Sequence, residues 1–254
     1  MSTGAWSFPA WRKLSGAPPL KHSAAQYILL GMRRSGHHAV RDWLVAHYPG
    51  EVVSHGFGNE RDWFIARDGV VRDCYIFNAE NIDPLSVAEC LDTDAWLSGT
   101  TRETVPKLGV VLRDPYNTLA GVLKFWGPGR STGVVETWAK YAREYTEGPR
   151  FLPARCVWVL YNRWFLESEY RLELEGRFGL PKLGVPIPDV QSHIGSSFER
   201  DVAPRDLQVE DRWKHFASDR EFLGRFQDRE VNRMAIQIFG DVARVVCKEL
   251  ELPS

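Results

Sequence analysis

The sequence has few cysteines, no long apolar run and no excess of either charge, and each absence excludes a class of protein. Its four cysteines are scattered singly, with no CxxC pair and no histidine at metal-ligand spacing. We therefore expect buried, reduced thiols rather than a disulfide scaffold or a zinc site. No apolar run approaches the roughly 18 residues of a membrane-spanning helix, and the first residues lack a basic start followed by an apolar segment. A cytoplasmic protein that does not associate with membranes is expected.

The near balance of charge excludes a strong overall attraction to polyanions. Lysine plus arginine (32) almost equals aspartate plus glutamate (33), so neither nucleic acid nor an anionic membrane surface is expected as a partner. Any anion site must therefore be local. Apolar residues make up 44% and charged residues 26% of the 254, which is typical of a globular protein with one sizeable core.

Apolar runs alternate with helical patterns along most of the chain. This alternation predicts an α/β fold of three layers, with a mainly parallel central sheet flanked by helices. We expect an irregular N-terminal arm at 1–25 and a single domain at 26–254. The Pro-, Gly- and Ser-rich segment 179–208 is long for a simple connection and is interpreted as a functional lid. The expected strands are 27–30, 51–54, 73–77, 108–112 and 156–160, and the expected helices start near 37, 84 and 115 and span 136–145, 163–178 and 229–250.

The stretch GMRRSG, residues 31–36, has two glycines at the spacing of a phosphate-binding loop. It lies between an expected strand and an expected helix, where backbone N–H groups and a helix N-terminus can hold an anion. In a nucleotide hydrolase or kinase the next residues are Lys and a Ser or Thr that holds Mg²⁺. Here they are His37 and His38, and histidine is a poor ligand for Mg²⁺. Arg33 and Arg34 place the cations inside the loop instead, which favours an anion that needs no metal, although a plain turn with solvent-facing arginines fits the same pattern.

A second stretch, VVLRDPYNTLAGVLKFWG at 110–127, follows another expected strand and opens a helix at Asp114 and Pro115. Together with GMRRSGHH it resembles the PAPS-dependent sulfotransferases, whose sulfuryl donor is 3′-phosphoadenosine 5′-phosphosulfate (PAPS). The resemblance extends from about Tyr27 to the end of the chain, and its specific part is confined to these two stretches and a weaker echo later. It implies a P-loop-like sulfotransferase architecture, with PAPS as donor, adenosine 3′,5′-bisphosphate as product and no required metal.

The resemblance assigns the 5′-phosphosulfate to the first loop. In the family this loop carries a basic residue, then Ser-Gly and two polar residues, where lysine and threonine are common. This chain departs from that pattern with an arginine and two histidines. Which side chain touches the sulfuryl group therefore stays open, and Arg33 can assist in binding it. The matching positions are Arg34, Ser35, Gly36, His37 and His38.

The resemblance assigns the 3′-phosphate to the second loop, where the family uses an arginine and a serine. Arg113 matches the arginine, but the serine position falls on Gly121, so Asn117, Thr118 or another loop must supply that contact. The weaker echo is GSSF at 195–198, which resembles a late loop that closes over the nucleotide. The remaining candidates of the late loop are Ser196, Ser197, Phe198 and Arg200, and a flexible polar loop is their structural alternative. Tyr161 matches a family position beside the nucleotide, and a tyrosine that only packs in the core is its structural alternative.

For the chemistry, we expect Arg34 to be the main stabiliser of transition-state charge, with His38 assisting. Family members place a His or Glu just after the third strand, which makes Glu80 the first candidate for the base. His55 is the second, because the unperturbed pKa of histidine lies near 6.5. Either residue can instead have a structural role, Glu80 by capping the turn before Asp83 and His55 by bonding loop carbonyls.

The acceptor is expected to be a small molecule or a glycan that offers a hydroxyl or amine. Two other functions compete with sulfuryl transfer. A P-loop nucleotide-dependent small-molecule kinase is disfavoured by the missing Gly-Lys-Ser/Thr, and a non-catalytic nucleotide-binding module would need Arg34 and Arg113 but no base. The sequence gives no indication of the oligomeric state. Aromatic surface for the acceptor is available at Phe57, Trp63, Phe64, Phe125 and Trp126.

Overall fold

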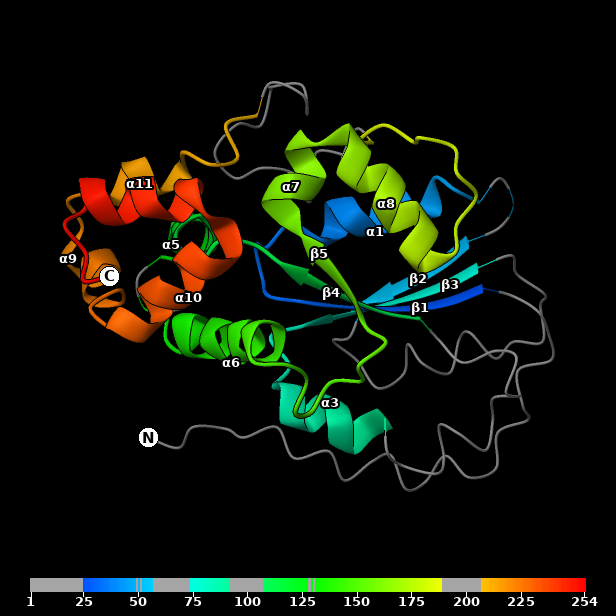
Figure 1. Ribbon diagram of the computed structural model, residues 1–254, viewed down its shortest axis with the longest axis horizontal. Coiled ribbons are helices and arrows are strands. Elements are labelled where there is room, and N and C mark those ends of the chain that lie inside the picture. Colours follow the sequence, from blue (N-terminus) through cyan, green and yellow to red (C-terminus); the bar gives the residue numbers. More distant parts are fainter. Residues whose placement is uncertain are drawn as a thin grey trace.

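Five parallel strands form one central sheet in the order β2-β3-β1-β4-β5 (Figure 1). The computed structural model describes residues 25–48, 50, 52–56, 74–91, 107–127, 129, 131–188 and 207–254. The strands are β1 (Ala25–Gly31), β2 (Val52–Gly56), β3 (Cys74–Glu80), β4 (Lys107–Leu112) and β5 (Val157–Leu160).

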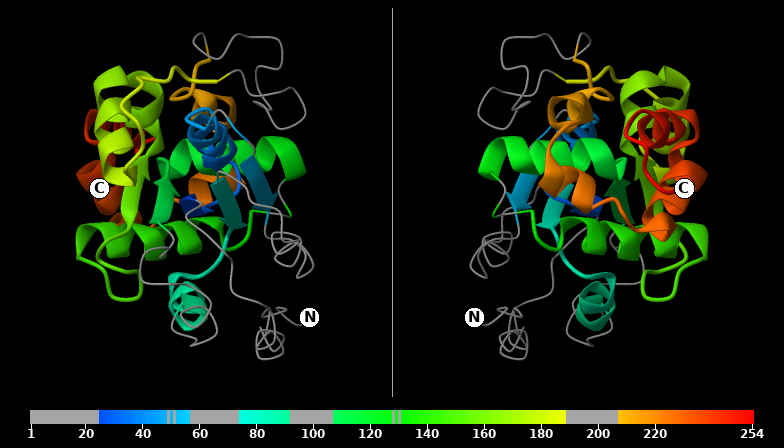
Figure 2. Two further views of the ribbon diagram at one scale, coloured as in Figure 1. Left: turned by 90° about the vertical axis from the view of Figure 1, so that its right-hand side faces the viewer. Right: turned by 90° about the vertical axis from the view of Figure 1, so that its left-hand side faces the viewer.

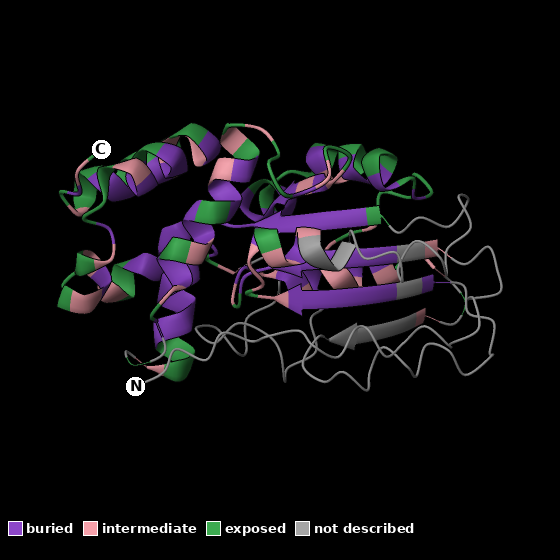
Figure 3. Ribbon diagram, turned by 90° about the horizontal axis from the view of Figure 1, so that it is seen from below, coloured by how far each residue is buried: buried purple, intermediate pink, exposed green. Residues whose placement is uncertain are grey.

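Helices cover both faces of this sheet and confirm the three-layer α/β architecture. Helices α1, α7 and α8 lie on one face and α3 and α6 on the other, and the end-on views of Figure 2 show α1 and α3 on opposite sides of the strands. Helix α5 and helices α9 to α11 gather beyond the carboxyl ends of the strands (Figure 3). The helices are α1 (His37–Val45), α3 (Pro84–Leu91), α5 (Pro115–Trp126), α6 (Val134–Thr146), α7 (Tyr161–Leu166), α8 (Ser168–Phe178), the 3₁₀ helix η5 (Arg212–Phe216), α9 (Arg220–Gly224), α10 (Arg229–Phe239) and α11 (Asp241–Glu249).

The core lies between the sheet and its helices. Strand β4 is buried at every position after Lys107, as expected for a parallel strand covered on both faces. Helix α1 buries Val40, Trp43 and Leu44 on one side, three and four residues apart, which is the period of an amphipathic helix. In Figure 3 strands such as β4 are accordingly buried along most of their length, while the outer helices show exposed stripes.

Two helix starts follow from Asp-Pro pairs as the sequence predicts. The Asp114 carboxylate accepts a hydrogen bond from the Asn117 backbone N–H at 2.8 Å, and Pro115 is the first residue of α5. The Asp83 carboxylate likewise accepts from the Leu85 backbone N–H at 3.0 Å at the start of α3.

Two predicted long helices are each divided in the structure. The helix expected at 229–250 is interrupted at Gly240, whose φ of 58° with ψ of −125° lies outside the helical region and separates α10 from α11. The helix expected at 163–178 begins earlier, at Tyr161, and is interrupted at Glu167, where the backbone is extended. This break lets the Tyr170 hydroxyl bond to the backbone of β5, at Leu160 N–H and the Trp158 carbonyl, so tertiary contacts outweigh helix propensity.

Strand boundaries also differ from the prediction in ways that matter for the site. Strand β3 runs to Glu80, so this residue ends the strand rather than lying three residues beyond it. Strand β2 runs from Val52 to Gly56, so His55 lies within it, opposite Phe77, rather than just past its end. Tyr161, which directly follows the strand expected at 156–160, is the first residue of α7.

Other expectations are only partly covered by the described residues. Cys74 and Cys247 are buried free thiols, whereas Cys156 is a free thiol that is only partly buried. Residues 1–24 and 189–206 lie outside the described part, so the arm, the single domain at 26–254 and the lid stay predictions. Among the helices that the structure describes, none has the length and apolar character to cross a membrane.

Candidate functional site

The candidate site lies at the carboxyl edge of the sheet, where the strand order reverses. Strand β1 sits between β3 and β4, so the chain leaves β1 toward one half of the sheet and later returns to the other. In open parallel sheets this switch point is where ligands bind. The segments that follow β1, β3, β4 and β5 begin at Met32, Asn81, Arg113 and Tyr161, and they share this edge.

The loop after β1 presents a positively polarised helix end. The Ser35 backbone N–H donates to the Met32 carbonyl at 3.0 Å, and the N–H groups of Ala39 and Val40 both donate to the Gly36 carbonyl. Gly36 is the N-cap of α1, no side chain caps it, and the first turn carries no acidic residue. The N–H groups at the start of α1 therefore lack helical acceptors and point their dipole at the loop, as in an anion cradle.

Two glycines let the loop pack closely. A Cβ atom at Gly36, whose φ is 87°, would lie 2.0 Å from the Tyr161 ring. A Cβ atom at Gly121 would lie 3.0 Å from the Cβ of Arg34. A serine at Gly121 would therefore lie tightly against the Arg34 side chain.

Arg34 is held in an unusual position. Its φ of 65° is left-handed, which non-glycine residues adopt rarely and at a cost of about 1–2 kcal/mol. The guanidinium lies over the Phe125 ring, with Cζ 5.1 Å from the centroid. Burial lowers the pKa of this guanidinium and the charge of Arg113 lowers it further, yet arginine stays charged at neutral pH. Two cations are thus gathered beside the loop.

Ser35 carries a buried polar atom without a partner. The residue is buried, and its Oγ has no hydrogen-bond partner among the residues that the structure describes. A buried hydroxyl in this state costs roughly 1–3 kcal/mol, so such groups call for an explanation. A ligand anion in the loop would provide the missing acceptor.

Glu80 connects three basic side chains of the loop and helix. Its Oε1 lies 3.3 Å from His37 Nε2 and 3.5 Å from His38 Nε2, and its Oε2 lies 3.4 Å from Arg33 Nε. Partial burial by itself raises the pKa of the Glu80 carboxyl, but the hydrogen bond from His38 and the nearby His37, His38 and Arg33 together outweigh burial, so the pKa is lowered. Glu80 is therefore an anion at neutral pH, and the predicted cap on the turn before Asp83 is not its main contact.

His37 is neutral in the folded protein. Its side chain is 1% exposed, and burial, together with the neighbouring His38, lowers its pKa to about 3. The two imidazole rings lie 4.1 Å apart, centroid to centroid.

His37, His38 and Glu80 offer ligand atoms within 4.8 Å of one another, the donor set of some iron and zinc sites. His38 argues against such use. Its Nδ1 lies 3.2 Å from Arg41 Nη1, and because arginine only donates, Nδ1 must accept. The proton of neutral His38 then sits on Nε2, facing Glu80, where a metal would need a lone pair.

Arg113 is placed beside the loop but is engaged with the backbone. The side chain is 1% exposed, and its guanidinium donates to the carbonyls of Val209 and Arg34 and lies 5.0 Å from the Tyr161 ring centroid. Asn117 is likewise buried, and its amide bonds to Asp114, the Glu210 carbonyl and the Trp213 N–H. Both residues thus tie segment 209–213 to the sheet edge.

Several predicted residues fall outside the description. Nothing is described for the side chain of His55, although its strand is present. Outside the described residues lie Ser196, Ser197, Phe198 and Arg200 of the late loop, and Phe57, Trp63 and Phe64 of the expected acceptor surface.

Sequence reasoning missed Asn81. Its Oδ1 accepts a hydrogen bond from the Arg33 backbone N–H at 2.9 Å, and its own backbone N–H donates to the Gly31 carbonyl. With φ of 55° it is left-handed, a conformation that asparagine tolerates better than most residues. The strand was expected to end at residue 77, so no sequence signal indicated that Asn81 would directly follow it.

Comparison of this chain with protein-family models and with curated proteins finds no match. The resemblance described above therefore rests on the residues of the two loops alone.

The neutral state of His37 predicts how stability depends on pH. Below about pH 6.5 the unfolded chain protonates this histidine, whereas the folded protein does so only near pH 3, so the folded state loses stability as the pH falls. Between pH 7 and pH 5 the loss from His37 amounts to about 2 kcal/mol. We expect the urea-unfolding free energy of His37→Gln to fall by about 2 kcal/mol less than that of the wild type over this interval.

The exposed His215 supplies the control, and His215→Gln is expected to keep the wild-type pH dependence. The same loss in His37→Gln and the wild type would show that His37 is not neutral in the folded protein.

Proposed function

We propose that this chain is a PAPS-dependent sulfotransferase that moves a sulfuryl group to a hydroxyl or amine of a small-molecule or glycan acceptor. One observation carries the proposal: the Gly31–Gly36 loop, with an uncapped helix end and Arg34, shares a sheet edge with Glu80 and Arg113. The loop offers donors and positive charge to an anion without an adjacent Lys-Ser/Thr for Mg²⁺. This supports an anionic donor that reacts without a metal.

In this proposal the loop binds the 5′-phosphosulfate. The backbone N–H groups of residues 36–38 and the Ser35 hydroxyl donate to its oxygens, and Arg34 contributes the charge. Gly36 and Gly121 are needed because larger residues would clash with Tyr161 and Arg34.

Arg113 is assigned to the 3′-phosphate by the resemblance. Its guanidinium already donates to the Val209 carbonyl, so a 3′-phosphate at this site requires that hydrogen bond to be exchanged. The exchange favours the phosphate, because bonds between a guanidinium and an anion are stronger than those to a neutral carbonyl.

The transfer step is an in-line displacement at sulfur. The acceptor oxygen or nitrogen forms a bond to sulfur while the bond from sulfur to the 5′-phosphate oxygen breaks. The electron pair of that bond leaves with adenosine 3′,5′-bisphosphate, where Arg34 stabilises the growing charge. The acceptor proton moves to the Glu80 carboxylate, the first candidate base.

Ligand-induced stabilisation tests this assignment against its competitors. A ligand that binds only the native state raises the unfolding free energy by about 2.7 kcal/mol at 100 times its dissociation constant. We expect adenosine 3′,5′-bisphosphate with EDTA to raise the melting temperature and ATP with Mg²⁺ to leave it unchanged. The reverse result would favour the kinase, and binding of PAPS without turnover on any acceptor would favour the non-catalytic module.

The pH dependence of turnover separates the candidate bases. Because the pKa of Glu80 is lowered, a Glu80 base stays ionised well below neutral pH, and kcat should hold steady from pH 8 to about pH 5.5. If His55 were the base, with the unperturbed histidine pKa near 6.5, activity would instead fall about tenfold per pH unit below that pH. Glu80→Gln is expected to bind the bisphosphate and lose turnover, and full activity in that variant would exclude Glu80.

A further inference from the structure

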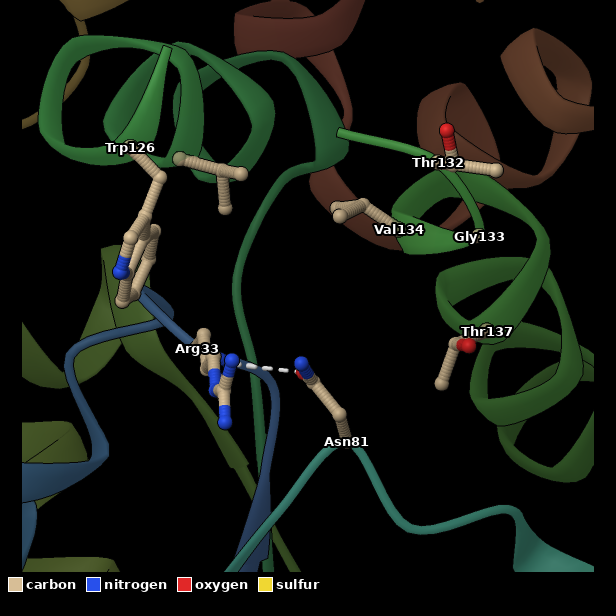
Figure 4. Close-up of a pocket in the computed structure, with 8 residues that line it drawn as sticks. Arg33, Asn81, Trp126, Thr132, Gly133, Val134 and Thr137 are labelled. Carbon is tan, nitrogen blue, oxygen red and sulfur yellow. Dashed lines mark hydrogen bonds between the residues drawn. The ribbon is translucent and has the colours of Figure 1, made fainter. Parts of the chain in front are cut away.

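A pocket of about 220 Å³ opens beside the loop, between the end of α5 and the start of α6. Figure 4 shows Arg33, Asn81 and Trp126 on one side and Thr132, Gly133, Val134 and Thr137 on the other. This volume lies below the roughly 300–1,000 Å³ of sites for drug-sized ligands. The pocket therefore suits a single ring with small substituents.

The charge of the pocket lining is positive. Among the described residues that line it, Arg33 is the one with a charge and none is acidic. The side chain of Arg33 is 52% exposed, and its Nε faces Glu80. Its Nη atoms have no hydrogen-bond partner among the described residues, so this end of the guanidinium is available to a ligand.

The opposite wall adds further donors. Gly133 is the N-cap of the 13-residue helix α6, and among the described residues no side chain caps it. The Val134 N–H donates to the Ser131 carbonyl at 3.2 Å, so the N–H groups that follow it in the first turn are the donors left for a ligand. The acidic residue of the first turn, Glu136, does not line the pocket and lies 4.0 Å from Arg225. Thr132 and Thr137 bring hydroxyl groups to the same wall.

Trp126 gives the pocket an apolar surface for a ring. Arg33 lies over this indole, with Cζ 5.5 Å from its centroid, and this contact orients the guanidinium. The indole is partly exposed, so a ring can pack beside Arg33 while its substituents reach the donors.

We infer that this pocket binds a small acceptor in which a hydroxylated ring carries a carboxylate. The carboxylate takes the Nη end of Arg33 and the ring lies along Trp126. Glu80 precedes the lining residue Asn81 and contacts Arg33, which brings the candidate base to the edge of this pocket. The acceptor role rests on the proposed function, whereas binding of the carboxylate does not.

Titration calorimetry on the full chain saturated with adenosine 3′,5′-bisphosphate tests the inference. The probes are 4-hydroxybenzoate against 4-hydroxybenzyl alcohol, and glucuronate against glucose, which separate an aromatic from a sugar ring. We expect at least one carboxylate to bind ten or more times tighter than its neutral counterpart. Arg33→Gln should reduce that preference below threefold, and Trp126→Leu should weaken both members of the pair.

Arg155→Gln provides the matched control, because Arg155 is exposed near the start of β5, at the opposite edge of the sheet. It should keep the wild-type preference. Equal affinity within both pairs, no binding of either carboxylate, or an unchanged preference in Arg33→Gln would overturn the inference. Failure of the bisphosphate to bind would instead refute the proposed function. The same titrations on the protein without bisphosphate would still show whether the pocket binds a carboxylate.

Discussion

Replacing Arg34 by asparagine is expected to lower kcat about 10²- to 10³-fold. This is the usual effect of removing one hydrogen-bond donor that stabilises the charge of a transition state. Arg34 is the cation inside the loop, and negative charge grows on the leaving phosphate as the bond to sulfur breaks. The loss should therefore exceed the loss in affinity for the bisphosphate product. Asparagine suits this test because it tolerates the left-handed φ of 65° and should leave the loop backbone in place.

Arg34→Lys separates charge from geometry, because lysine keeps the charge but lacks the planar fork. We expect it to recover part of the lost turnover. The control is Arg163→Ala, since Arg163 is an exposed residue of α7 that forms an ion pair with Glu167 four residues along the chain. A kcat within threefold of the wild type in Arg34→Asn, with an unchanged melting temperature, would remove Arg34 from the mechanism.

Gly36→Ala is expected to destabilise the protein by about 3–5 kcal/mol. Its φ of 87° alone costs alanine about 1–2 kcal/mol. In addition, the new Cβ would lie 2.0 Å from the buried Tyr161 ring, which has little room to move between Gly36, Arg113 and Trp164. Urea unfolding measures the loss, and bisphosphate affinity should fall with it because the loop must shift.

Gly133 offers a matched control for backbone strain. It is also a helix N-cap, its φ is 83°, and nothing lies within 4 Å of the position of an added Cβ. Gly133→Ala should therefore cost only about 1–2 kcal/mol. The cost of the Gly36→Ala and Tyr161→Ala pair together should be less than the sum of the two single costs. Equal costs for Gly36→Ala and Gly133→Ala would mean that the contact with Tyr161 is not limiting.

The fold could be predicted because its signals are local. Short stretches of sequence are enough to predict the apolar strands, the Asp-Pro helix starts and the amphipathic period of α1. Asp114 caps α5 and Pro115 is its first residue, as the capping preferences of these residues predict. The missed breaks have different causes. Gly240 was a visible signal, whereas the break at Glu167 depends on Tyr170 reaching β5, a contact between separate elements.

The site could be predicted only in part for the same reason. The loop motif pointed to Arg34, and the family resemblance singled out Glu80 and Arg113. The structure brings the three to one edge because parallel strands have their carboxyl ends there. The link from Glu80 to both histidines and Arg33 depends on side-chain directions that no pattern carries. The engagement of Arg113 with Val209 joins residues that are 96 positions apart, and likewise has no sequence signal.

A crystal structure grown with adenosine 3′,5′-bisphosphate in the presence of EDTA tests the central claim most directly. The account predicts the 5′-phosphate within hydrogen-bond distance of the backbone N–H groups of residues 36–38, with the Arg34 guanidinium on its oxygens. A 5′-phosphate bound outside this loop, or a nucleotide that enters it only when Mg²⁺ is supplied, would contradict the account.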